Sequence, residues 1–273
     1  MWKKLPTYLL ILVFLTGLSL LLYPPLSDYW NSFHQSRAIS EYTDLVAHID
    51  EQEYEAIRSD AEAYNQALPT NLRRFHPSDA EHEAYMKLLN INGHGIMGHL
   101  RIPVIDCSLP IYHSVDEAVL QIAAGHIEGT SLPVGGPGTH CVLSGHRGLP
   151  SARLLSNLDK VSEGDIFMIQ TLETCLTYQV DQIRIVQPNE LSDLDIVPGR
   201  DYCTLVTCTP YGINSHRLLV RGHRIENREE ADKLRVPVDA RQIDPTLVAA
   251  IVAVPLLMIV MTVMLLGSGK KKR

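Results

Sequence analysis

Two long apolar runs lie near the two ends of the chain. Residues 5–23 form one run without a charged side chain, and residues 247–267 form the second. A bilayer core of roughly 30 Å is crossed by about 20 apolar residues in an α-helix, so each run is long enough to span a membrane. Pro255 in the second run is compatible with a membrane helix that bends. The pattern predicts two transmembrane helices with a polar region between them.

The first apolar run has a second interpretation. Lys3 and Lys4 precede it, as basic residues precede the apolar core of a secretory signal peptide. No small-x-small cleavage site is clear after Ser19, and residues 23–25 (YPP) are typical of a rigid exit from a membrane span. Basic flanks stay in the cytoplasm. Lys3, Lys4 and the basic cluster at 270–273 therefore predict that both termini are cytoplasmic and that the region between the spans is extracellular.

Between the apolar runs, the first periodicity is helical. Over residues 34–67, apolar side chains recur at spacings of three and four, which predicts a helix that ends at Pro69. A shorter helical pattern covers residues 80–89. The glycine-rich stretch 90–98 then marks a boundary.

After residue 98 the pattern changes to short apolar segments typical of strands. Their ranges are 100–105, 139–144, 165–171, 175–186, 202–207 and 217–224. The segment 175–186 changes phase near Asp181 and Gln182, which predicts a bulge there. Residues 151–158 predict a short helix. Many short strands between glycine and proline turns indicate a closed β-barrel or a β-sandwich.

These patterns divide the chain into seven parts. In order they are a cytoplasmic tip (1–4), a transmembrane helix (5–23), an extracellular helical segment (24–98), a β domain (99–225), a charged linker (226–246), a second transmembrane helix (247–267) and a basic cytoplasmic tail (268–273).

The charged side chains are distributed unevenly between the ends and the middle of the chain. The chain has 31 acidic and 24 basic side chains and a net charge of −7. Between positions 24 and 246 there are 18 basic and 31 acidic side chains, a net of −13. A hydrophobic content of 45% excludes a disordered polar chain, and the acidic central region excludes a broadly basic nucleic-acid-binding protein.

The five cysteines fit neither a zinc ribbon nor a thioredoxin-type site, because their spacing is irregular and no CxxC occurs. An odd number in an extracellular domain leaves at least one cysteine without a partner in its own chain. Cys203 and Cys208 lie five positions apart on one predicted strand, so their side chains face opposite sides of the sheet. We expect Cys107, Cys141 and Cys175 in the core, with a disulfide between some pair left open.

The segment 201–224 has the richest chemistry. A predicted strand runs into Cys208, residues 210–212 (PYG) break it, and a second strand begins near Arg217. If the two strands pair as a hairpin, Cys208 and Arg217 lie at the same end of the sheet. Their residue types allow either a buried thiol beside a surface arginine or a nucleophile with a cation that favours thiolate or a developing oxyanion.

A cysteine nucleophile usually needs an imidazole, and three histidines are candidates. His146 follows an apolar strand and lies between two glycines, which would leave its ring open to a cleft. His126 follows Gly125, and His216 precedes Arg217. Chemistry alone favours His146 but leaves the other two open, and a turn histidine without a role is the alternative for each.

These residues together resemble the sortase family. Residues 204–208 (TLVTC) followed by Arg217 resemble the sortase signature TLxTC with its downstream arginine, and residues 144–148 (SGHRG) resemble the catalytic-histidine loop. The longer match, across residues 97–225, is similar to the class C, pilin-polymerising sortases. It includes the segments 109–113 (LPIYH), 125–133 (GHIEGTSLP), 145–152 (GHRGLPSA) and 208–214 (CTPYGIN).

The resemblance implies an eight-stranded β-barrel and a cysteine transpeptidase without cofactor or metal. Cys208 would attack the Thr–Gly bond of an LPxTG-like sorting signal and form a thioester. His146 would act as general acid and base, and Arg217 would hold the substrate and its oxyanion. The resemblance to class C further implies a pilin lysine as acceptor, with pilin subunits and the membrane as partners and no nucleic acid. The enzyme would lie in the cell membrane with its catalytic domain outside.

The chain departs from the class C pattern in its lid segment. Class C sortases typically carry an Asp-Pro-aromatic motif whose acid and aromatic side chains cover the active site. The counterpart here is His76-Pro77-Ser78, with Phe75 before it and Asp79 after it. A histidine in the place of the acid could not form the same ion pair with Arg217. We therefore predict a weak and mobile lid.

Other functions stay open at this stage. Within the family, a sortase that anchors proteins to the cell wall is the second candidate. A non-catalytic scaffold that binds a sorting signal would keep the barrel but form no thioester. A zinc site made of cysteine and histidine has little support from the spacing.

Overall fold

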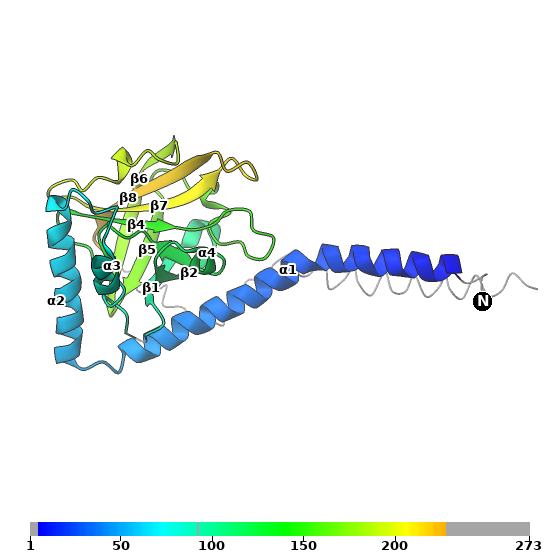
Figure 1. The fold of residues 1–273 in the computed structure, drawn as a ribbon, viewed down its shortest axis with the longest axis horizontal. Coiled ribbons are helices and arrows are strands. Elements are labelled where there is room, and N and C mark those ends of the chain that lie inside the picture. Colours follow the sequence, from blue (N-terminus) through cyan, green and yellow to red (C-terminus); the bar gives the residue numbers. More distant parts are fainter. Residues whose placement is uncertain (1–4, 92, 228–273) are drawn as a thin grey trace, which may run out of the picture.

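The computed structural model describes residues 5–91 and 93–227. It places two long helices and two short ones around a closed barrel of eight strands (Figure 1). The helices are α1 (Leu5–Val46), α2 (Glu51–Ala67), α3 (Asp79–Tyr85) and α4 (Glu117–Leu120). The strands are β1 (Ile96–Ile102), β2 (Cys107–His113), β3 (Ala124–His126), β4 (Thr139–Ser144), β5 (Ile166–Thr171), β6 (Thr174–Val186), β7 (Asp201–Thr209) and β8 (His216–Ile225).

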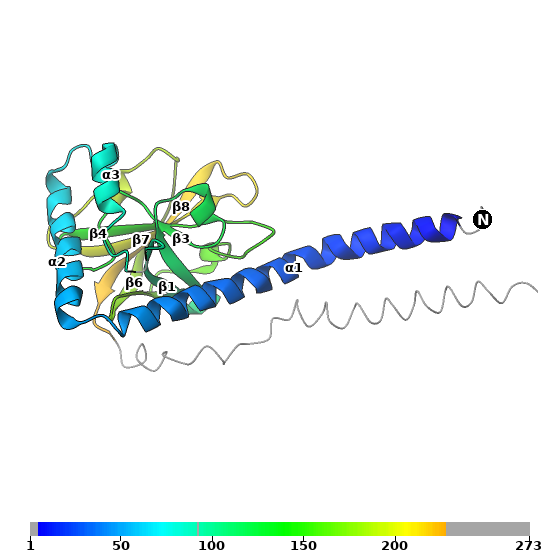
Figure 2. The same ribbon diagram turned by 60° about the horizontal axis from the view of Figure 1, so that its bottom comes forward.

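Helix α1 is longer than the pattern predicted. Its 42 residues include Pro24 and Pro25, so the chain does not leave the helix at residues 23–25 but stays helical to Val46. Proline lacks the backbone donor and its ring crowds the carbonyl four residues earlier, which bends or breaks many helices, but α1 continues through both prolines. Figure 2 shows α1 lying along the barrel at one end and projecting from it at the other.

Only α1, among the described residues, is long and apolar enough to cross a membrane. The predicted cytoplasmic tip at 1–4 lies outside the described residues. So do the linker beyond residue 227, the second span at 247–267 and the basic tail at 268–273. The prediction of two spans is thus matched by one candidate helix within the described part of the chain.

The helix predicted over 34–67 is two helices. The chain turns at Ala47–Asp50, and Asp50 begins α2, where its side chain accepts a hydrogen bond from the Glu53 N–H. An aspartate at this position satisfies a free backbone donor of the first turn, which the apolar periodicity alone did not reveal. The shorter helix predicted over 80–89 is α3, which ends at Tyr85.

The barrel closes in the order β1-β2-β3-β4-β7-β8-β6-β5. The pairs β2–β3 and β4–β7 are parallel, and the others are antiparallel. Each of the six predicted strands corresponds to an observed one, but the first, predicted over 100–105, ends at Ile102 and is followed by a 3-10 turn at Pro103–Ile105. The predicted bulge is confirmed as a register shift between Val180 and Gln182. Strands β2 and β3 were not predicted, because Pro110 interrupts the first and the second has only three residues.

The alternation of side chains on β7 separates two apolar clusters. Cys203 and Leu205 point into the barrel, where they join the main core with Phe167 and Tyr178. Val206 points to the outer face, where it packs with Val142, Val186, Leu194 and Leu219. Leu194 belongs to the loop between β6 and β7, so that loop covers part of the outer face. The outer face of β4, β7 and β8 therefore has an apolar layer of its own.

The helix predicted over 151–158 is wrong. The chain there makes turns, followed by a single 3-10 turn at Leu158–Lys160. Leu154 has a φ of 41°, which a right-handed helix does not allow. The Leu155 N–H donates to the carbonyl of His146 at 3.2 Å, so this segment bonds the loop before it instead of its own preceding turn.

Candidate active site

Cys208 and Arg217 are direct partners across the β7–β8 hairpin. Residues directly opposite in an antiparallel pair place their side chains on the same face. That face is the outer one, because Cys208 is two positions after Val206 and Arg217 two positions before Leu219. Both side chains are half-buried. The hairpin predicted from the sequence thus presents thiol and guanidinium side by side at the end of the sheet.

The loop that follows β4 brings His146 to the same place. Ser144 pairs with Val206 in the parallel β4–β7 ladder. Gly145 continues the pairing: its N–H donates to the Val206 carbonyl at 3.0 Å, and its carbonyl accepts from the Thr207 hydroxyl at 2.8 Å. Continued by one residue, this register would place His146 opposite Cys208, so we expect the imidazole on that side of the thiol.

The two rival histidines are not presented to Cys208. His126 is fully buried, and its ring nitrogens bond the Tyr85 hydroxyl and the Ser131 carbonyl, both at 2.9 Å. Because a carbonyl only accepts, Nε2 carries the proton and Nδ1 accepts from Tyr85. His216 pairs with Thr209, one position beyond Cys208, so it faces the other side of the sheet.

The electrostatics of Arg217 differ from those of other arginines on the barrel. Its guanidinium donates to the carbonyls of Asn214 and His216, at 3.2 and 3.1 Å. Within residues 5–91 and 93–227 no carboxylate forms an ion pair with it. By contrast, Arg147, Arg184 and Arg221 each bond an aspartate, namely Asp159, Asp193 and Asp181. A cation without a carboxylate beside a thiol is free to stabilise a thiolate or an oxyanion.

Residues that the sequence did not single out support the histidine loop. Glu117 accepts from His146 Nε2 at 3.3 Å, and the bonds from Gln121 and His146 lower the pKa of the Glu117 carboxyl. Gly148 has a φ of 80°, and a Cβ there would meet the Tyr211 ring at 2.9 Å. This glycine therefore lets the loop pack against the β7–β8 turn. Glu117 lies 29 residues before His146, so no local pattern could connect the two.

Arg147 joins the histidine loop to two other elements. Its guanidinium donates to Asp159 at 2.6 Å and to the Thr209 hydroxyl at 3.3 Å, and it lies 5.9 Å from the centre of the Tyr211 ring. Thr209 is the residue after Cys208. The side chain next to His146 is therefore bonded to the strand end that carries the cysteine.

The predicted lid residues lie on a segment attached to two loops. Arg74 donates to Asp195 in the β6–β7 loop at 3.0 Å, and Phe75 packs under the Arg74 guanidinium and against Gly129. His76 and Pro77 are exposed. In the described part of the chain, none of the predicted lid residues bonds Cys208 or Arg217.

Two of the predicted lid residues have a structural role of their own. Ser78 caps α3 through a capping box with Glu81, and Asp79 is the first residue of that helix. The acidic side chain that follows the His76-Pro77-Ser78 segment, Asp79, thus lies in the first turn of a helix. Whether the segment protects the thiol stays a prediction.

All five cysteines are free thiols. Cys107, Cys141 and Cys203 are buried, and Cys175 is half-buried, so three side chains lie in the core and the expected burial of Cys175 is incomplete. Cys141 and Cys203 are direct neighbours on β4 and β7. Burial raises the pKa of the Cys107 thiol to about 12. The described residues include no group of three side chains arranged to hold a metal ion.

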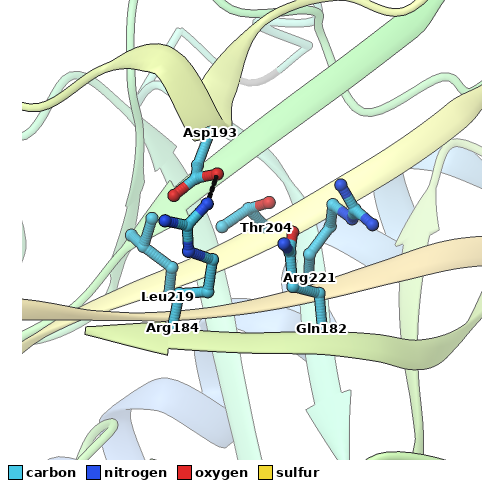
Figure 3. Close-up of a pocket in the computed structure, with 6 residues that line it drawn as sticks. All are labelled: Gln182, Arg184, Asp193, Thr204, Leu219 and Arg221. Carbon is cyan, nitrogen blue, oxygen red and sulfur yellow. Dashed lines mark hydrogen bonds and ion pairs between the residues drawn. The ribbon is translucent and has the colours of Figure 1, made fainter. Parts of the chain in front are cut away.

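A shallow hollow lies further along the same outer face (Figure 3). Thr204 and Arg221, which line it, are paired across β7 and β8, and the Arg184–Asp193 ion pair forms one of its walls. Thr204 is four strand positions from Cys208, or about 13 Å at the rise of a strand. The hollow is therefore separate from the thiol.

Comparison with known proteins shows the family to which the chain belongs. The sortase domain model matches residues 100–225. The crystal structure of sortase C1 from Streptococcus agalactiae is 53% identical, with a TM-score of 0.68, and the match covers 70% of this chain and 100% of that one. The chain belongs to the sortase family. Sortase C-1 from Actinomyces oris is 44% identical over 63% of this chain and 98% of that chain, with a TM-score of 0.59.

Matches to curated sortases are more distant and shorter. Sortase A of Streptococcus agalactiae is 29% identical over 117 residues, which are 42% of this chain and 47% of that protein. The chain thus spans about half the length of this curated relative. The solved C-type sortases, by contrast, are matched almost from end to end, and they share the eight-stranded barrel described above.

Proposed function

We propose that this sortase is a membrane-anchored cysteine transpeptidase that cleaves an LPxTG-like sorting signal between Thr and Gly and transfers the acyl group to a pilin lysine. The observation that carries the proposal is the meeting of three elements at one end of the barrel: the Cys208–Arg217 pair and the loop of His146. The similarity to solved C-type sortases supports the choice of a pilin over other acceptors.

The first half-reaction follows from the residue types. The Cys208 thiolate attacks the carbonyl carbon of the substrate threonine, and the Arg217 guanidinium stabilises the oxyanion that forms. The His146 imidazolium donates its proton to the nitrogen of the departing glycine as the C–N bond breaks. The products are a thioester on Cys208 and a free amine, with His146 left neutral.

The second half-reaction returns the enzyme to its starting state. Neutral His146 accepts a proton from the incoming lysine amine, which attacks the thioester carbonyl. The C–S bond then breaks, and the product is an amide between the threonine and the lysine side chain. Cys208 leaves as a thiolate beside Arg217, and the imidazolium is restored. The thioester keeps the energy of the cleaved bond, so the transfer needs no nucleotide.

The proposed location follows from α1. The helix is apolar over the part that projects from the barrel and carries the domain at its other end (Figure 2). The basic residues at 3 and 4 favour a cytoplasmic N-terminus and an extracellular barrel. A membrane anchor would keep the thiol where secreted substrates emerge.

The direct test is intact mass spectrometry of the full chain in detergent after incubation with an LPxTG peptide. We expect a mass increase equal to the acyl part of the peptide, removed by hydroxylamine and absent from Cys208→Ala. A wild-type protein that binds the peptide without a mass increase would instead be a scaffold.

A competition experiment tests the acceptor. When the enzyme is given an LPxTG peptide and two competing amines, it should join the peptide to a pilin-derived lysine peptide in preference to a cell-wall peptide. The reverse preference would favour the anchoring role.

A further inference from the structure

Helix α1 presents one row of polar side chains to the barrel close to the end of its uncharged run. Asp28, Asn31 and Gln35 are spaced by three and four residues, so they lie along one side of the helix. The same side continues into Tyr42 and Val46, which are buried against β1. The barrel is therefore in contact with α1 from five residues beyond Tyr23 onward.

Two of these polar residues hold the segment that follows His146. The Asn31 side-chain amide donates to the Ser151 carbonyl at 2.8 Å. The Asp28 carboxylate accepts from the Arg153 backbone N–H at 2.8 Å and forms an ion pair with the Arg153 side chain at 3.2 Å. The segment from 149 to 157 is neither helix nor strand, so such bonds replace the regular backbone pairing that it lacks.

The same segment closes back on the histidine loop. The Leu155 N–H donates to the His146 carbonyl at 3.2 Å, and the Ser156 hydroxyl accepts from the Gly148 N–H at 2.9 Å. A displacement of residues 151–153 would therefore move the backbone of His146. The segment 151–156 thus connects α1 to the histidine loop through hydrogen bonds at both of its ends.

Gln35 contacts the chain next to a second element near His146, the helix α4 that carries Glu117. Its side-chain amide donates to the Ile122 carbonyl at 2.8 Å, just after α4. Helix α4 begins at Glu117, whose carboxylate accepts from the ring of His146. The row on α1 thus reaches both the loop that carries the imidazole and the element that bonds its ring.

We propose that Asp28, Asn31 and Gln35 are positioning residues for His146, so that the helix proposed to anchor the enzyme also sets the geometry of its general acid and base. This inference rests on the proposed function. It predicts an effect on turnover and not on substrate binding, because the three side chains bond backbone groups of Ser151, Arg153 and Ile122 and, in the described part of the chain, none of them bonds Cys208 or Arg217.

The sharpest test is Asn31→Asp in the full chain in detergent. The change conserves size but replaces the donor with a carboxylate that repels the Ser151 carbonyl. We expect kcat for thioester formation to fall about tenfold, because displacement of a catalytic group lowers the rate, with KM unchanged.

Two substitutions of Asp28 separate its hydrogen bond from its charge. Asp28→Asn keeps an acceptor for the Arg153 N–H, and its kcat should stay within about twofold of wild type because a partly exposed ion pair contributes little. Asp28→Ala removes the acceptor as well, so its kcat should fall further.

The matched control is Arg37→Ala with Ser40→Ala, two exposed side chains on the same helix. Hydrogen exchange of residues 146–156 gives a readout independent of turnover, and Asn31→Asp should exchange faster there than the control. Equal kcat in Asn31→Asp and the control, or a fall explained by a lower melting temperature, would overturn the positioning role alone. A wild-type protein that forms no thioester would overturn the proposed function, and the positioning role with it.

Discussion

Strand β7 carries cysteines into two regions that contain similar residue types. Inside the barrel, Cys203 lies beside Cys141, and His126 is next to that pair. On the outer face, Cys208 pairs with Arg217, and the loop that carries His146 is bonded to the neighbouring Thr207 through Gly145. Burial raises the pKa of the Cys203 thiol well above its usual range, and the neighbouring groups that add to this shift are Cys141 and Asp201, not a cation. A thiol near an imidazole is therefore not enough for a nucleophile; access and a cation without a carboxylate distinguish the outer group.

The largest expected contrast is between the two cysteines of β7. Cys208→Ala should lower peptide cleavage by about 10⁴-fold or more, because the nucleophile is lost. Cys203→Ala should leave kcat and KM near wild type but lower the free energy of unfolding by about 1–2 kcal/mol, because it opens a cavity in the core. Peptide cleavage and urea unfolding measure the two effects. Residual cleavage by Cys208→Ala would remove the assignment.

The histidines give the next contrast. His146→Asn should reduce cleavage about 10³-fold without a change in stability, as loss of a general acid and base does. His126→Asn should instead destabilise the fold by about 1–3 kcal/mol, since it disturbs the bonds to Tyr85 and Ser131. The same cleavage and urea assays apply. If His126→Asn lost catalysis at full stability, the assignment of the two histidines would be reversed.

A smaller effect is expected for the arginines of β8. Arg217→Lys keeps the charge but loses the planar fork of donors, so kcat should fall about 10²-fold. Arg221→Lys is the matched control on the same face, because Arg221 is already bonded to Asp181. It should change kcat by less than about twofold, as expected when an ion pair outside the site is altered. Comparable losses in the two variants would indicate a general requirement for guanidinium groups on β8.

The smallest effect concerns the lid. Arg74→Ala removes the bond to Asp195, and we expect the alkylation rate of Cys208 by iodoacetamide to rise by less than about threefold, since a partly exposed ion pair holds the segment weakly. Point substitution is preferable to deletion because Tyr85 and Leu89 are buried in the core. Arg73→Ala is the control. A rise of about tenfold or more would show strong protection and contradict the prediction of a weak lid.

Local patterns predicted much of the barrel and the residue types of its site. The alternation over 175–186 predicted both β6 and its bulge, because side chains on a half-buried strand must change face where an extra residue enters. The strand ending at Cys208 and the turn after it predicted the hairpin partner Arg217. In each case the information lies within one or two neighbouring elements.

The rest depends on contacts between distant segments. The register of β4 on β7, which brings the loop of His146 to the strand end that carries Cys208, joins residues about 60 positions apart and leaves no mark in either sequence segment. The turns at 151–158 were mistaken for a helix because their bonds go to His146 and to α1. Strand β2 was missed because Pro110 is tolerated there by its pairing with β1, a fact of topology and not of composition.

The uninterrupted course of α1 has a mechanical consequence. In the proposed topology the helix leaves the bilayer near Tyr23 and ends at Val46, a length of about 35 Å at the rise of an α-helix. Because the barrel is bonded to α1 from Asp28 onward, the length of helix between Tyr23 and these bonds would fix the height and tilt of the thiol above the lipid. A sorting signal that is itself tethered in the membrane would then be cut only where its own spacer reaches that height.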